Sequence, residues 1–214
     1  MKPFLPIFFL LFVTSFVNAQ NQNSKSNKAD AAWLSNAQAA ILKNEYFFKS
    51  MTSSFGCANR KQKVIYNINS NGYSVTPLNN KPDDGLNKSW QASFQLLDIN
   101  KGTAGLKPAT KPLYTTYEGS LIQSHPFFYI QYTNDEDGLR QNFIIAKKPE
   151  GSKNLVVRMQ IENKDLHLEL VNDNILKFKN DSGRTIIQYD GLKVWDANDK
   201  PLKAFMKLSE KKYS

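Results

Sequence analysis

The chain has 214 residues and a formal net charge of +9, from 28 basic and 19 acidic residues. A chain of this length can bury a core without staples, and its one cysteine, Cys57, excludes an internal disulfide. The positive charge favours acidic partners, but the lysines are spread along the sequence without an arginine cluster or a nucleic-acid-binding motif. Nucleic acid is therefore not an expected partner.

Residues 1–19 have the pattern of a secretory signal peptide. Lys2 precedes an apolar run, Phe4–Val13, and small residues up to Ala19 mark a cleavage point. The apolar run is too short for a membrane span, and no later stretch reaches the roughly 20 apolar residues that a span needs. The sequence predicts an exported protein of the periplasm or the cell surface, without an integral membrane segment.

A leader and a helix are expected after the signal peptide. Residues 20–29 are polar and low in complexity, which is typical of a disordered segment. Asp30 is a suitable N-cap, and Trp33 and Ala37 would share one helical face. A helix is therefore predicted over residues 30–44.

From residue 45 onward, short runs alternate apolar and polar residues and are separated by turn residues, which is the pattern of β-strands. The expected strands are Val64–Asn69, Tyr73–Leu78, Trp90–Ile99, Tyr114–Tyr117, Leu121–Tyr132, Phe143–Ala146, Leu155–Glu162, Leu166–Val171, Leu176–Phe178, Thr185–Tyr189, Leu192–Trp195 and Ala204–Leu208. A turn is expected at Lys81–Gly85 and a long loop at Lys101–Pro112. The sequence thus predicts an all-β protein, an antiparallel β-sandwich over residues 45–214 with one short N-terminal helix, as one unit or two sub-sheets.

An acidic loop between two apolar runs raises the question of a calcium site. Asp135 and Asp137 supply carboxylates, but Thr133 and Ile144 occupy the first and last ligand positions of an EF-hand frame. A looser calcium site at Asp135 and Asp137 stays open. The alternative is a polar hairpin turn with Gly138 in a left-handed conformation.

Little in the sequence predicts catalysis. Cleavage of a glycosidic bond needs two facing carboxylates, such as Glu118 with Asp135 or Asp137, but the acidic residues lie in turns or alternate outward. His125 and His167 share no metal-ligand spacing, and a single cysteine cannot complete a zinc set. No catalytic residue, metal or cofactor is predicted, and a glycan-cleaving enzyme is the least favoured function.

The aromatic run Phe127–Tyr132 is the strongest candidate for binding. Consecutive residues of a strand point to opposite faces, so one set would fill the core and the other could form an exposed platform. Burial of both sets between sheets is the alternative. The predicted ligand face consists of Phe128, Tyr129 and Tyr132.

Two sets of short motifs carry a family resemblance. The first is Asn134-x3-Gly138-Leu139-x-Gln141-x-Phe143, and the second is Tyr189-x-Gly191-Leu192-x-Val194-x-Asp196. They resemble the N-terminal β domain of large secreted bacterial surface proteins, which carry β-propeller-type or immunoglobulin-like repeats and a C-terminal sorting domain. Here the domain would be free-standing.

The resemblance covers about residues 45–208 and implies a β-sandwich without a catalytic centre. It assigns turn or packing roles to Asn134, Gly138, Leu139, Gln141, Phe143, Tyr189, Gly191, Leu192 and Asp196. The predicted function is a non-enzymatic binding or structural module of the bacterial envelope or surface, in contact with another envelope or surface protein. The alternative is a carbohydrate-binding module that holds a polysaccharide against Phe127–Tyr132.

Overall fold

A computed structural model describes residues 28–78, 90–102 and 105–209, so the predicted signal peptide and the Lys81–Gly85 turn lie outside the described residues. The chain divides into two compact units, Met1–Ala39 and Ala40–Ser214. Helix α1 (Lys28–Glu45) spans the boundary, and every described strand lies in the second unit. No described helix is long and apolar enough to cross a membrane.

The helix is longer than predicted. It begins at Lys28 instead of Asp30 and ends at Glu45, so the last two residues of the predicted disordered leader are helical. Six of its 18 residues are alanine, which has the best helix propensity. These residues continue the helix past the expected N-cap.

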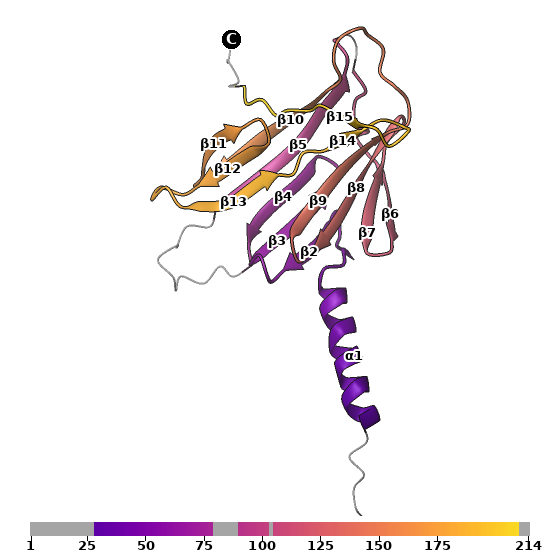
Figure 1. The fold of residues 1–214 in the computed structure, drawn as a ribbon, viewed down its shortest axis with the longest axis vertical. Coiled ribbons are helices and arrows are strands. Elements are labelled where there is room, and N and C mark those ends of the chain that lie inside the picture. Colours follow the sequence, from indigo (N-terminus) through magenta and orange to yellow (C-terminus); the bar gives the residue numbers. More distant parts are fainter. Residues whose placement is uncertain (1–27, 79–89, 103–104, 210–214) are drawn as a thin grey trace, which may run out of the picture. The chain divides into compact units, whose positions relative to one another are not determined.

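The largest sheet is antiparallel and has the strand order β1-β2-β3-β4-β5-β10 (Figure 1). Its strands are β1 (Lys49–Ser50), β2 (Phe55–Asn59), β3 (Val64–Asn69), β4 (Gly72–Pro77), β5 (Gln91–Asn100) and β10 (Val156–Lys164). A four-stranded sheet has the order β6-β7-β8-β9. It consists of β6 (Leu113–Tyr117), β7 (Ser120–Ser124), β8 (Phe128–Asp135) and β9 (Gly138–Ile145).

Two smaller sheets follow in the chain. The three-stranded sheet is a meander of β11 (His167–Asn172), β12 (Ile175–Lys179) and β13 (Thr185–Asp190). The last pair is β14 (Val194–Trp195) with β15 (Pro201–Leu202). The predicted all-β, sandwich-like antiparallel fold with one helix is confirmed.

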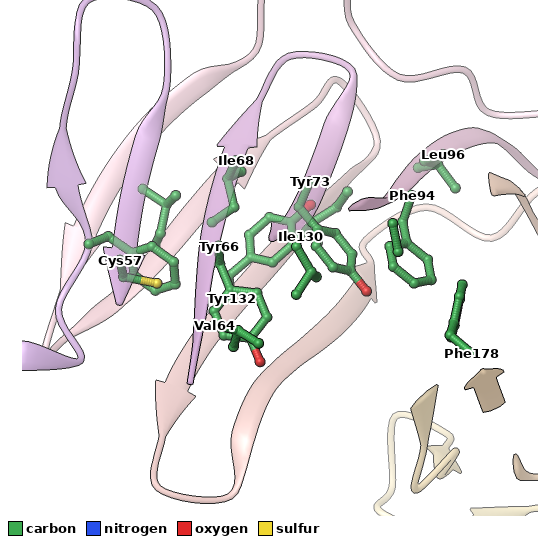
Figure 2. Packing of buried hydrophobic residues seen from close by; sticks show 14 of the residues in the cluster. Cys57, Val64, Tyr66, Ile68, Tyr73, Phe94, Leu96, Ile130, Tyr132 and Phe178 are labelled. Carbon is green, nitrogen blue, oxygen red and sulfur yellow. The ribbon is translucent and has the colours of Figure 1, made fainter. Parts of the chain in front are cut away.

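The core lies between the sheets, because alternate side chains of each strand point inward. In β3, Val64, Tyr66 and Ile68 are buried, as their spacing predicts. Figure 2 shows this row beside side chains of β4, β5, β8 and β12. Tyr73 stacks on Phe94 at 4.6 Å between ring centroids. Tyr73 also meets Tyr132 of β8 edge-on, and Phe94 meets Phe178 of β12 edge-on. One aromatic cluster therefore joins three sheets.

Close backbone packing explains one hairpin glycine. The β3–β4 connection is Ser70-Asn71, and Gly72 follows with φ +137°. A Cβ atom at Gly72 would lie 1.9 Å from the carbonyl oxygen of Phe94 on β5. Glycine is required here both for the backbone angle and for the approach of the next strand.

Three predictions of strands were wrong or incomplete. Strand β2 was not predicted, because Gly56 and Ala58 have low β propensity. Ala204–Leu208 is not a strand, although the N–H of Met206 donates to the carbonyl of Asp173 at 2.7 Å. Leu121–Tyr132 is two strands, because Pro126 has no N–H to donate to a ladder.

Candidate binding surface

The aromatic run is split between the two faces of β8. Phe128 and Tyr132 are buried in the core, at 2% and 0% exposure, so the predicted ligand face was wrong at both positions. Tyr129 points outward and is 37% exposed, and Phe127 just before the strand is 44% exposed. The break at Pro126 starts a new strand, and the core requires the alternate set Phe128, Ile130 and Tyr132.

On the outer face of the four-stranded sheet, both apolar and polar side chains surround Tyr129. The register places Ser124 and Ile144 on either side of Tyr129. Next to this row, Asn142 Nδ2 donates to Gln131 Oε1 at 3.4 Å. Gln131 in turn donates to the hydroxyl of Ser120 at 3.5 Å. The face thus combines one exposed aromatic ring with a ladder of amide and hydroxyl groups.

Strand β6 forms one edge of this sheet and pairs only with β7 among the described strands. Leu113 and Tyr117 are 76% and 63% exposed on its outer face. The strand reads Leu-Tyr-Thr-Thr-Tyr, with no charge and no proline. Natural edge strands are usually protected by charges, prolines or bulges, because unpaired N–H and C=O groups can pair with another chain. Strand β6 has none of these protections.

The turn that precedes β7 determines which backbone groups of β6 are free. Glu118 and Gly119 form a two-residue connection with φ of +46° and +80°, as in a type I′ hairpin. In such a hairpin Tyr117 and Ser120 exchange hydrogen bonds, and bonded and unbonded positions then alternate. The N–H and C=O groups of Tyr114 and Thr116 therefore point away from β7, toward the open edge.

A buried network of hydrogen bonds anchors the inner face of β6. Gln123 donates to the Tyr114 hydroxyl at 3.2 Å and to the carbonyl of Asn69 at 3.1 Å. Gln123 Oε1 accepts from the Tyr132 hydroxyl at 3.4 Å. Burial raises the pKa of Tyr114, whose ring also packs on Phe55 at 4.9 Å. The inner side chain of the edge strand is thus anchored while its outer side chains remain exposed.

The acidic loop is a two-residue turn, Glu136-Asp137, between β8 and β9. Asp135 Oδ1 accepts from the N–H of Asp137 at 2.9 Å, Glu136 pairs with Lys61, and Gly138 has φ +130°. Among the described residues, no group of three or more His, Cys, Asp or Glu side chains is placed to hold a metal ion. The hairpin turn with glycine at positive φ is the arrangement observed.

Asn134 is not a turn residue, contrary to the role that the resemblance implied. It is buried, and its amide donates to the carbonyls of Tyr46 and Ala58, both at 3.1 Å. Its Oδ1 accepts from Asn59 Nδ2 at 3.0 Å. Asn59 also donates to the carbonyl of Asp135 at 2.7 Å. This pair of buried amides links β2 to β8, between the two large sheets.

The positions of the first motif that follow the turn pack against the core or hydrogen-bond beneath the sheet. Leu139 and Phe143 pack against the core. Gln141 Nε2 contacts the Tyr132 hydroxyl at 3.4 Å. Because Tyr132 also contacts Gln123, the motif extends the polar network beneath the sheet.

The second motif lies around β13 and β14. Tyr189 stacks on Phe94 with 5.6 Å between the ring centroids, and Gly191 has φ +70°. The N–H of Leu192 donates to Asn174 Oδ1 at 2.7 Å. Asp196 Oδ1 accepts from the N–H groups of Asn198 and Lys200, so Asp196 organises the turn before β15. Tyr189 therefore packs against the core, while Gly191 follows β13 and Asp196 lies at the start of a turn.

The two histidines lie in different structural settings. His125 Nδ1 accepts from the N–H of Ala109 at 3.0 Å, and burial lowers the pKa of His125. His167 Nε2 lies 3.0 Å from Asp181 Oδ1 at the surface. The two imidazoles belong to separate elements, and each has a local partner.

Comparison with known proteins supplies no relative on which to base a function. No family model matches the sequence. No curated protein and no solved structure matches the chain either. The resemblance to the N-terminal β domain of secreted surface proteins therefore remains a prediction.

Proposed function

We propose that the protein is an exported, non-enzymatic binding module of the bacterial envelope, which holds a partner protein by adding a strand to β6. The observation that carries this proposal is the unprotected edge, with Leu113 and Tyr117 exposed on an uncharged strand. Strand addition gains main-chain hydrogen bonds, while side chains at alternate positions supply specificity. Export is supported by the signal-peptide pattern of residues 1–19.

The partner segment has a definable chemistry. Leu113, Thr115 and Tyr117 alternate on the outer face, so a paired strand would present apolar side chains at every second position there. The free groups of Tyr114 and Thr116 supply two donors and two acceptors. We therefore expect an extended, uncharged segment of about five residues with apolar side chains at alternate positions.

A crosslinking experiment tests this proposal. A photoreactive phenylalanine analogue at Tyr117, in the tagged full chain, is activated in living cells, and the crosslinked peptide is sequenced by mass spectrometry. We expect crosslinks to one short segment of one protein. A synthetic peptide of that segment should bind the purified protein, as measured by calorimetry.

The matched variants are Thr116→Pro and Thr116→Ala. Proline removes the free N–H of the edge without disturbing the ladder to β7, and edge strands tolerate proline. We expect Thr116→Pro to weaken peptide binding at least ~10-fold, which is about 1.4 kcal/mol, and Thr116→Ala to have little effect. Circular dichroism checks that both variants are folded. Equal binding by the two variants, or crosslinks only to a second copy of this chain, would contradict the proposal.

A second candidate function is carbohydrate binding by the outer face. The observation that favours it is the exposed Tyr129 ring on the same face as the half-buried amides of Gln131 and Asn142. An aromatic ring can stack on a sugar while polar groups bond its hydroxyls. A polysaccharide array on which Tyr129→Ala loses a signal that Thr116→Pro keeps would favour this function over strand addition.

A further inference from the structure

Two lysine-rich loops cross the same end of the sandwich. Residues 101–112, of which the structure describes 101–102 and 105–112, join β5 to β6, and residues 146–155 join β9 to β10; the described parts lie at the upper end of these strands in Figure 1. Strands β5 and β10 are paired with Val156 opposite Asn100, so the first loop starts beside the point where the second ends. Together the two loops contain six lysines and one acidic residue, Glu150.

The loops touch each other through their backbones. The N–H of Lys153 donates to the carbonyl of Lys101 at 3.3 Å. Gly102 lies against the Lys153 side chain, since a Cβ atom there would be 2.4 Å from Lys153 Cδ. An open cleft of about 500 Å³ lies beside this contact. It is lined by Asn100, Gly102, Lys153, Asn154 and Val156. The cleft therefore has a lysine and two amide side chains at its wall.

The buried carboxylate of Asp98 neutralises only part of the positive charge at this end of the molecule. Asp98 accepts from Arg158 and, at 3.1 Å, from Lys107 Nζ, so these two cations are already paired. The remaining lysines of the loops are half-buried or exposed, namely Lys101, Lys111, Lys147, Lys148 and Lys153. A surface with this excess of cations attracts anions, and the attraction weakens as salt is added.

We propose that this end of the molecule binds an acidic polysaccharide, with one carboxylate- or phosphate-bearing sugar in the cleft. The lysines extend over two loops instead of converging on one point, which suits a chain of repeated anionic groups better than one small anion. The amide of Asn154 is suited to sugar hydroxyls, whereas the Asn100 amide already bonds Asp98 and the N–H of Gly102. Among the described residues, no aromatic side chain lines the cleft, so they offer no stacking of the kind on which single-stranded nucleic acids depend.

The proposal does not depend on the β6 edge, and its test uses different residues. The purified protein is titrated with polygalacturonate, with a phosphorylated dextran and with neutral dextran, and affinity is measured by biolayer interferometry at low and moderate salt. The two acidic polymers distinguish a carboxylate from a phosphate as the recognised group. We expect binding to at least one acidic polymer, no binding to neutral dextran, and weakening with salt.

Two triple variants with the same change in net charge decide whether the site is local. Lys101→Gln, Lys148→Gln and Lys153→Gln remove charge from the two loops. Lys49→Gln, Lys63→Asn and Lys177→Gln remove it from β1, the β2–β3 turn and β12. We expect the loop triple to lose at least ~10-fold in affinity and the control triple to stay within about two-fold of wild type.

Three results would overturn the proposal. They are equal losses in the two triple variants, equal binding to neutral dextran, and binding only to vesicles of anionic lipid. Melting temperatures of both variants show whether a loss reflects misfolding. Because these lysines leave the β6 backbone unchanged, a failure here leaves the strand-addition proposal to its own test with Thr116→Pro.

Discussion

At the residue scale, the buried amides of Asn59 and Asn134 show how polar groups can determine the alignment of two sheets. A buried amide without partners costs free energy, so each of its donors and acceptors must find one. Asn134 meets this requirement with two carbonyls and Asn59, all from segments far away in the sequence. The two sheets are thereby aligned by directional bonds as well as by apolar packing.

We predict that Asn134→Ala lowers the free energy of unfolding by about 3 kcal/mol, because it removes the amide that bonds the Tyr46 and Ala58 carbonyls and one of the two acceptors of Asn59 Nδ2. Urea denaturation followed by fluorescence measures the change. The control is Asn142→Ala on the outer face, which should change stability by less than about 1 kcal/mol. Equal effects of the two substitutions would show that the amide bonds between the sheets contribute little.

At the element scale, strand β5 contains a bulge that positions a carboxylate. The pairing with β10 shifts between Arg158 and Met159, so that Asp98 faces Arg158 and Leu96 faces Met159. Leu97 is the extra residue and is 37% exposed, whereas Asp98 is 1% exposed. A bulge changes the direction of the side chains that follow it. Here it buries Asp98 where Arg158, Lys107 and Asn100 reach it.

The hydrogen bond from Arg158, with those from Asn100 and Lys107, holds the pKa of Asp98 well below its usual range despite burial. A depressed pKa means that the carboxylate stabilises the fold above the unfolded pKa of about 3.9 and loses this contribution as the pH falls below that value. We predict that Asp98→Asn costs about 2–3 kcal/mol at pH 7, the range for hydrogen bonds to charged groups.

The pH dependence of stability distinguishes the loss of an ion pair from a packing defect in Asp98→Asn. The stability difference between wild type and Asp98→Asn should narrow as the pH falls below about 4, because the wild-type carboxylate is then being protonated. Urea titrations at several pH values measure it. Asp199→Asn, in an exposed turn at positive φ that asparagine tolerates, is the control. A difference that stays constant with pH would rule out the ion-pair explanation.

At the scale of the whole molecule, Cys57 reports on the shared core. Its side chain is buried among residues of several sheets, and burial raises the pKa of its thiol to about 12. The thiolate is the reactive form, so the folded protein should resist alkylation near pH 8. Opening of the core is then required before the thiol reacts.

We predict that brief labelling of Cys57 with iodoacetamide along a urea titration has the same midpoint as tyrosine and tryptophan fluorescence. Coincident midpoints are expected where one core holds the sheets together and unfolding is cooperative. Labelling well below the fluorescence midpoint would instead show that β2 opens on its own.

The sequence predicted the features that depend on local periodicity. Alternation in Val64–Asn69 and turn glycines such as Gly138 and Gly191 are visible within a few residues, and the structure confirms them. The sandwich class followed from many such runs. Alternation predicted that consecutive aromatic residues of this run point to opposite faces, but which of the two aromatic sets faces the core depends on the neighbouring sheet.

Features that depend on distant partners were not predictable. Asn134 sits next to a turn in the sequence, and nothing local shows that Tyr46 and Ala58 lie opposite it. Asp98 gave no signal because Arg158 is on another strand. The exposed edge had a signal, the uncharged run of β6, but its position at the end of the sheet order is a property of topology.

The open edge of β6 also affects the tendency of the protein to self-associate in solution. Two copies of the chain can meet edge to edge, and nothing in the strand itself opposes that pairing. Repulsion between molecules of net charge +9 keeps copies apart at low ionic strength. Added salt shortens the reach of that repulsion to about 8 Å at physiological concentration, while backbone pairing is little affected. Purification at low ionic strength therefore keeps the chain dispersed, whereas concentrated, salty solutions bring unpaired strands together.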